Sequence, residues 1–169
     1  MSKSILTQAR VRELFNYDSN TGNLIRITYK SPNANIGDIA GNSDSGYSRI
    51  SVDSIRYFAH QIIWLYVYGM LPVYPEHEVD HLDQDTSNNR IDNLRLTDSS
   101  GNMKNKPKYK NNKSGSVGVR RRSDNGKWQA YIGVDGKLIS LGTFNCITAA
   151  VIARKAAEVR YGFHANHGK

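Results

Sequence analysis

Short apolar stripes separated by turn residues organise the first third of the chain. Residues 8–15 carry apolar side chains at helical spacing, and Thr7 before them is a suitable N-terminal cap. The stretch YDSNTGNLIRITY predicts a turn at Asn20–Gly22 between two extended segments, and GYSRISVDSIRYF predicts two strands around a turn at Asp53–Ser54. Ala59–Tyr68 then has helical spacing and is followed directly by a glycine, which predicts a helix that ends there.

A strand, loop, strand and helix pattern follows in residues 77–105. HEVDH reads as a strand that ends at Asp80 and His81, and LDQDTSNNRIDN reads as a polar loop. LRLT reads as a returning strand, and DSSGNMKN starts a helix with Asp98 or Ser99 as its cap. Neighbours in a strand point to opposite faces, so Asp80 and His81 are expected to serve different partners.

The last third predicts a small sheet backed by one helix. Three runs rich in strand formers, at 117–122, 127–134 and 137–144, are separated by Asn-Gly and Asp-Gly, which favour tight hairpin turns. A helix over 147–161, capped by Asn145, carries alanines at helical spacing that let it lie close to a sheet. His164 and His167 follow this helix in a short tail and are expected to be solvated.

Charge divides the chain into unequal parts. Residues 1–105 carry 10 Lys and Arg against 12 Asp and Glu, whereas residues 106–169 carry 13 against 3, a net charge of +10. A basic surface of this kind is typical of nucleic-acid binding, and the alternative is an ordinary solvated surface. We therefore expect domains at 1–105 and 117–169, joined by a polar, cationic linker at 106–116.

Other sequence features narrow the class of protein. A single cysteine, Cys146, excludes an intramolecular disulfide and fits a reducing compartment. The start MSKSILTQAR has no apolar core of a signal peptide, and the longest apolar run, at 62–71, is too short to span a bilayer. We therefore expect a cytoplasmic protein without membrane contact.

The segment Val79–Asn105 has the chemistry of a metal-assisted hydrolase. It holds His81, five aspartates and several asparagines but no cysteine, so a structural zinc site is disfavoured. Oxygen ligands suit one Mg²⁺ or Mn²⁺ ion, and an imidazole that is not bound to the metal suits a general base. Together they can hydrolyse a phosphodiester. The alternative is that these polar residues only form turns, which is the interpretation preferred for Asp85, Asn88 and Asn89.

The same segment resembles the HNH endonucleases of phages and mobile introns. DH, NNRIDNLR and NMKN follow one another in the order typical of that family, within residues 60–105. The resemblance implies a ββα-metal fold, His81 as general base and Asn93 as the residue that orients its imidazole through the loop. It also implies Asp80 and Asn102 as metal ligands. Asn102 stands where the last histidine of the family usually stands, which makes this an H-N-N variant.

The basic third resembles the AP2 domain over residues 114–162. The motifs GVRRR, GKWQAYI and LGTF follow in order, and the family lays its three-stranded sheet in the DNA major groove. Alternation puts the valines of the first strand and Ala130 and Ile132 against the helix, and leaves Trp128 open between core and contact. The outward face is expected to meet double-stranded DNA through Arg120, Arg122, Lys127, Gln129 and Tyr131. Phosphate contacts are expected from Lys106, Lys108, Lys110 and Lys113.

The sequence thus predicts an α+β chain in which a ββα-metal nuclease domain is joined to a three-stranded antiparallel sheet with one helix. The expected activity is metal-dependent cleavage of double-stranded DNA by a site-specific enzyme of homing or phage type, acting as a monomer. Two alternatives remain open: a non-catalytic DNA-binding regulator, and a nuclease directed at RNA.

Overall fold

A computed structural model describes residues 6–28, 34–43 and 46–169. Two expectations fall partly outside the described residues. Residues 1–5 belong to the stretch that argues against a signal peptide, and Tyr29 ends the second expected extended segment. The chain divides into two compact units, residues 1–99 (unit 1) and 100–169 (unit 2), and the division precedes the expected linker at 106–116. None of the described helices has the length and apolar character needed to cross a bilayer. Each unit is described by itself.

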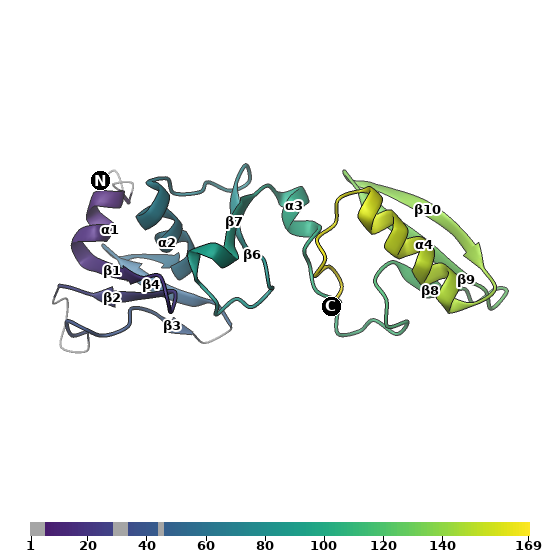
Figure 1. Cartoon of the computed structure of the whole chain (residues 1–169), viewed down its shortest axis with the longest axis horizontal. Coiled ribbons are helices and arrows are strands. Elements are labelled where there is room, and N and C mark those ends of the chain that lie inside the picture. Colours follow the sequence, from purple (N-terminus) through teal and green to yellow (C-terminus); the bar gives the residue numbers. More distant parts are fainter. Residues whose placement is uncertain (1–5, 29–33, 44–45) are drawn as a thin grey trace. The chain divides into compact units, whose positions relative to one another are not determined.

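Unit 1 combines short antiparallel sheets with two helices (Figure 1). β1 pairs with β2, β3–β4–β5 form a three-stranded sheet, and β6 pairs with β7. In chain order the elements are α1 (Gln8–Leu14), β1 (Phe15–Asp18), β2 (Asn23–Arg26), β3 (Asn42–Ser43), β4 (Ser48–Val52), β5 (Ile55–Phe58), α2 (Ala59–Tyr68), β6 (Glu78–His81), the 3₁₀ helix η1 (Ile91–Asn93) and β7 (Leu94–Thr97).

Local sequence signals explain several of these boundaries. The Thr7 side chain accepts a hydrogen bond from the Arg10 N–H at 3.2 Å, which caps α1 as predicted. Asp53 and Ser54 both have positive φ, of 47° and 66°, as the tight turn between β4 and β5 requires. Gly69 ends α2 in the left-handed conformation, with φ 75°. The predicted helix at Ala59–Tyr68 is confirmed at both ends.

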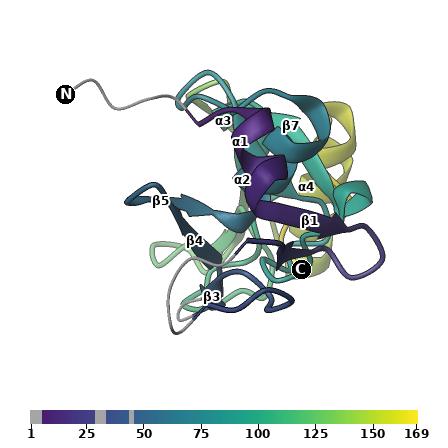
Figure 2. The same ribbon diagram turned by 90° about the vertical axis from the view of Figure 1, so that its left-hand side faces the viewer.

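The core of unit 1 lies between α2 and the strands. Ile62 and Ile63 of α2 and Ile50 and Val52 of β4 are each at most 1% exposed, and they belong to one cluster with Phe15 of β1. Figure 2 shows β4 and β5 side by side. The opposite face of this sheet, which carries alternate residues of β4, is exposed to solvent.

Helix α3 (Ser99–Met103) follows β7, and unit 2 continues with a three-stranded antiparallel sheet of order β10–β9–β8. Its strands are β8 (Val119–Arg121), β9 (Trp128–Val134) and β10 (Lys137–Phe144), and α4 (Ile147–Arg160) packs against them. Ala150 of α4 is fully buried and joins Val119 and Ala130 in the core, so the predicted small-residue stripe is confirmed. Trp128 packs half-buried against the same cluster.

Three local predictions for unit 2 are wrong. The first strand begins at Val119 rather than at 117, because Gly118 has φ +71° and a Cβ there would lie 2.4 Å from the Tyr131 carbonyl oxygen. It also ends one residue early, before Arg122. The cap of α4 is Cys146 rather than Asn145.

The C-terminal tail is also less solvated than expected. His167 is only 6% exposed, and its Nε2 lies 3.1 Å from the Arg154 guanidinium. Arg154 forms a buried ion pair with Glu158 at 2.9 Å and donates to the Tyr131 carbonyl at 2.8 Å. The expectation of a solvated His167 is therefore wrong, because this buried charged network draws the tail onto α4.

Candidate active site

The β6–β7 hairpin carries the two residues that the sequence singles out as metal ligand and base. Its strands pair antiparallel, with Asp80 opposite Arg95. Burial alternates along β6, so Val79 and His81 are buried while Asp80 is half-buried. Asp80 and His81 therefore lie on opposite faces of the strand, as the sequence predicts.

His81 is held in one orientation by a neighbouring amide. Its side chain is only 3% exposed, and its Nε2 lies 3.0 Å from Oδ1 of the buried Asn89. An amide oxygen only accepts hydrogen bonds, so this contact places a proton on Nε2, and in the neutral ring the lone pair is then on Nδ1. In this tautomer Nδ1 can take up a proton, which is the chemistry of a general base.

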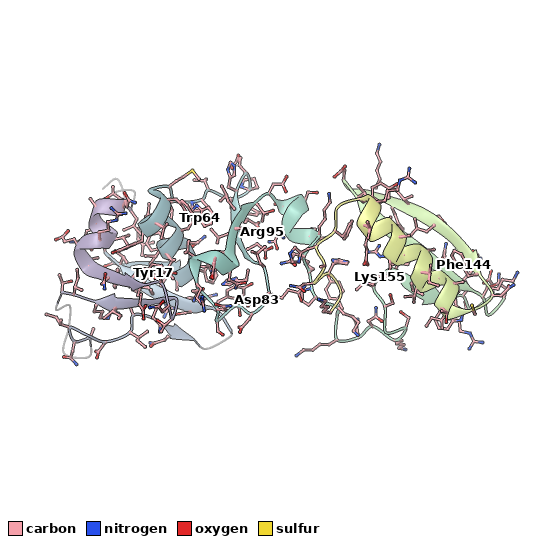
Figure 3. The ribbon with its side chains drawn as sticks, in the orientation of Figure 1. Tyr17, Trp64, Asp83, Arg95, Phe144 and Lys155 are labelled. Atoms are coloured by element: carbon pink, nitrogen blue, oxygen red, sulfur yellow. The ribbon has the colours of Figure 1, made fainter. Side chains whose placement is uncertain are left out.

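The β1–β2 hairpin supports the loop that carries Asn89. The Tyr17 hydroxyl donates to the Asn89 carbonyl oxygen at 3.3 Å and accepts the Ile91 N–H at 2.9 Å. At Gly22, where φ is +76°, a Cβ would lie only 2.6 Å from the Arg90 backbone nitrogen. Only glycine allows this close approach, so the hairpin fixes the loop from outside. Figure 3 labels Tyr17 on β1 and Asp83 in the loop between β6 and β7.

Asn93 acts on the loop through Asp83. The Asn93 amide donates to Asp83 Oδ1 at 2.9 Å and to the Asn88 carbonyl at 2.8 Å, and its Oδ1 accepts the Asp83 N–H at 3.1 Å. Burial opposes ionisation of Asp83, but hydrogen bonds from Asn88, Asn93 and the Asp85 N–H outweigh it and lower its pKa. Asn93 is thus placed to fix the polypeptide that directly follows His81, and its orienting role stays a prediction.

An aromatic cluster surrounds the other side of His81. The rings of His60 and His81 meet edge to face, with centroids 5.1 Å apart, and His60 stacks on Phe58 at 5.3 Å. Tyr47, whose exposed fraction is 39%, lies 6.1 Å from His81 and 5.4 Å from Phe58. Burial, with a smaller repulsion from His81, lowers the pKa of His60 to about 3, so His60 stays neutral beside His81.

Asp80 forms an ion pair with Arg95 across the hairpin. Arg95 Nη2 and Nε lie 2.8 and 3.2 Å from Asp80 Oδ2, and the exposed fractions of the two side chains are 29% for Arg95 and 14% for Asp80. The Arg95 guanidinium offsets the charge of the half-buried Asp80 carboxylate. Arg95 is labelled in Figure 3. A cation that binds Asp80 must share this carboxylate with Arg95.

The comparison with known families bears on this segment of the chain. Residues 57–104 match the HNH endonuclease family. Residues 57–104, called the HNH segment below, run from β5 to the residue after α3 and contain His60, Asp80, His81 and Asn89. The expected resemblance is confirmed at this level, while the match gives no support for a homing subtype or for an AP2 domain. Searches of curated proteins and of solved structures found no significant match to the chain.

The side chains of the HNH segment that are predicted to bind a metal ion are oxygen donors. Within the described ranges, no three His, Cys, Asp or Glu side chains are grouped to hold an ion. The Asp80 carboxylate and the Asn102 amide are hard donors, and Mg²⁺ is often held by one or two protein ligands and completed by substrate phosphate and water. Each of the two groups is a donor of the kind that Mg²⁺ takes, and their action as ligands of one ion stays a prediction. Asn102 is half-buried in α3 and is described with unit 2.

The sheet of unit 2 presents a polar outward face. Arg120 donates to Gln129 Oε1 at 2.9 and 3.1 Å, and its guanidinium carbon lies 5.7 Å from the centroid of the Tyr131 ring. Ala130 and Ile132, between and beyond these positions on β9, are fully buried, so the predicted alternation is confirmed. Arg122 lies one residue past β8, where both oxygens of Asp124 bind its guanidinium. Lys127 is exposed and lies one residue before β9, which begins at Trp128 rather than at the predicted 127.

The lysine-rich stretch is tied to the C-terminus through its backbone. The Gly168 N–H donates to the Lys106 carbonyl at 3.0 Å, and the Lys108 N–H donates to the Lys169 carbonyl at 3.3 Å. The side chains of the four lysines predicted to contact phosphates are all exposed, and they are Lys106, Lys108, Lys110 and Lys113. Their contact with phosphates stays a prediction.

Proposed function

We propose that the protein is a metal-dependent DNA endonuclease that hydrolyses phosphodiester bonds with His81 as general base. One observation carries this proposal: a buried imidazole, fixed by Asn89 in a defined tautomer, stands directly beside a half-buried carboxylate within the HNH segment. Buried polar groups are arranged in this way where a proton must be moved at a defined position.

His81 takes the proton of the attacking water at Nδ1. Asn89 keeps the opposite nitrogen protonated, so the imidazole needs no rearrangement before it acts. Tyr17 and Asn93 hold the loop on which Asn89 depends. His60 and Tyr47 support the ring by contact, and His60 adds no positive charge that would oppose proton uptake.

Asp80 and Asn102 would hold one Mg²⁺ or Mn²⁺ ion. When bound, the ion neutralises charge on the phosphate and on the leaving oxygen. Asp80 contributes the negative charge of the site, and Arg95 limits how far that carboxylate can turn.

The outward face of the unit 2 sheet is the proposed reader of double-stranded DNA. Arg120 is already aligned by Gln129 and by the Tyr131 ring, and an arginine presented in this way can bind guanine at two acceptors. Arg122 must first leave Asp124 to do the same. The motifs shared with AP2 domains and with phage or intron nucleases support a site-specific enzyme of homing type.

Plasmid cleavage tests the proposal directly. The full chain is incubated with supercoiled plasmid in Mg²⁺, in Mn²⁺ and in EDTA, alongside the variant His81→Ala. We expect cleavage only with a divalent ion, and a loss of about 10²–10⁴-fold in the variant while DNA binding persists. Binding without cleavage by the native chain would instead identify a non-catalytic DNA-binding regulator. Cleavage at the native rate by the variant would exclude His81 as the base.

A further inference from the structure

A basic hollow lies on the solvent side of the β3–β4–β5 sheet, and none of the residues used above for DNA binding lines it. It has a volume of about 280 Å³, and Arg26, Arg49 and Arg56 line it together with Asp38. Arg49 is on β4 and Arg56 on β5, in positions that face solvent, and the two strands are paired so that Arg56 lies opposite Ser51. Figure 2 labels the three strands of this sheet.

Charge pairing distinguishes the arginines of this hollow from several other arginines of the chain. Within the described ranges 6–28, 34–43 and 46–169, none of the three forms an ion pair, unlike Arg10, Arg90, Arg95, Arg122 and Arg154. Among the described residues that line the hollow, the only acid is Asp38, and it already accepts the Asn35 N–H at 2.8 Å. The hollow therefore carries an excess of positive charge within a unit whose overall charge is close to balanced.

Aromatic rings hold two of these guanidinium groups in place. Arg49 lies 4.9 Å from the centroid of Phe58, and Arg26 lies 5.7 Å from the centroid of Phe15. A guanidinium stacked on a ring keeps its edge donors directed outward and loses little freedom on binding an anion. Two of the three guanidinium groups that line the hollow are therefore positioned before any anion binds.

A series of ring contacts links Arg49 of the hollow to the candidate active site. Phe58, which carries Arg49 on one side, stacks on His60 at 5.3 Å, and His60 meets His81 at 5.1 Å. A backbone phosphate bound by Arg49 is thus connected through two packed rings to the proposed base. This chain of contacts lies wholly within unit 1.

We propose that Arg26, Arg49 and Arg56 form a second DNA-docking surface, which binds backbone phosphates of the duplex that the nuclease cuts. The proposal rests on the proposed function for the identity of the partner. It adds a surface of unit 1 to the DNA contacts expected from the basic last third of the chain. Phosphate contacts of this kind carry no sequence information, so this surface positions the cleaved strand while unit 2 selects the site.

Salt-dependent binding separates this surface from general charge. The full chain and its variants are titrated onto a duplex in EDTA, between 50 and 200 mM salt, so that no cleavage occurs. Log affinity falls linearly with log salt concentration, and each phosphate contact makes this slope more negative by about 0.9. Arg49→Gln and Arg56→Gln should each make this negative slope shallower by about 0.9, and the double variant should make it shallower by about 1.8. Over this fourfold salt range the double variant should therefore lose about 12-fold less affinity than the native chain.

Arg12→Gln is the matched control. It removes the same charge from an exposed arginine of the same unit, but Arg12 lies on α1 against Tyr66 and does not line the hollow. Its slope should equal that of the native chain. Equal slopes in the native chain and the double variant would overturn the proposal, and so would an equal drop in Arg12→Gln. A larger change on duplex RNA than on DNA would overturn the choice of partner.

The outcome is independent of the proposed catalysis. If the native chain binds duplex DNA with the expected slopes but fails to cut in Mg²⁺, the docking surface stands and the nuclease function fails. If it cuts and the slopes do not differ, the nuclease function stands and the docking surface fails.

Discussion

Removing the Asn89 amide should show how much cleavage depends on the orientation of the His81 ring, as distinct from the presence of the ring. In Asn89→Ala, the buried Nε2–H of His81 loses its acceptor at 3.0 Å. Leaving a buried donor unsatisfied costs about 1–3 kcal/mol, which should appear in the free energy of unfolding. The hydrogen bond itself is worth about 0.5–1.5 kcal/mol, and a loss of that size from the transition state lowers kcat by about 2–13-fold.

The assay is single-turnover cleavage at saturating DNA, together with urea unfolding of the same preparations. His81→Ala, expected to lose about 10²–10⁴-fold, sets the scale for complete removal of the base. Asn88→Ala is the matched control, because the Asn88 side chain binds Asp83 and not the imidazole. A folded Asn89→Ala that cuts at the native rate would refute the argument that Asn89 orients His81. A loss as large as that of His81→Ala would mean that Asn89 itself contacts the reacting groups.

Three further predictions test other parts of the molecule. His60 has a folded pKa of about 3 against 6.5 for an unperturbed histidine, so the unfolded chain binds more protons between these values. The stabilisation from keeping His60 neutral is complete above pH 6.5 and is lost as the pH falls toward 3. The free energy of unfolding of the native protein, measured in urea, should therefore fall by up to about 3 kcal/mol more between pH 7 and pH 4 than that of His60→Phe. Asp80→Ala and Asn102→Ala should each raise the Mg²⁺ needed for half-maximal cutting by at least about tenfold, and unchanged metal titrations would place the ion elsewhere. Arg120→Ala should weaken binding to a target duplex by about 1–3 kcal/mol more than to a scrambled one, whereas Lys108→Ala should weaken both equally; equal losses for Arg120→Ala would make the sheet an electrostatic clamp.

Local signals were sufficient where one short stretch determines its own structure. The helix at Ala59–Tyr68 has apolar spacing throughout and a glycine at its end, so both of its boundaries follow from the sequence. The alternation of β9 likewise fixed which side chains are buried, because a strand of seven residues offers enough positions for the pattern to be unambiguous. Gly118 misled the prediction of β8, since a glycine before Val119 does not reveal whether its φ is positive.

The residues that complete the candidate site were not predictable in this way. Asn89 was interpreted as a turn residue because it stands in a polar loop, and nothing in its neighbours distinguishes it from Asn88. Its contact with His81 depends on how the whole loop folds back onto β6. Tyr47 approaches His81 from the bend before β4, 34 residues earlier in the chain. Such contacts are set by tertiary packing, which a periodic pattern does not encode.

The β1–β2 hairpin shows why the nuclease site needs more chain than the HNH segment. The loop between β6 and β7 is rich in polar residues and buries little apolar surface, so its own packing cannot fix Asn89. Tyr17 satisfies the Asn89 carbonyl and the Ile91 N–H with one hydroxyl, and Gly22 lets the hairpin backbone reach the loop backbone. Both residues lie outside residues 57–104. The position of Asn89, and with it the orientation of His81, thus depends on a hairpin that begins more than 60 residues before His81, so the framework of the candidate site extends beyond the HNH segment to β1 and β2.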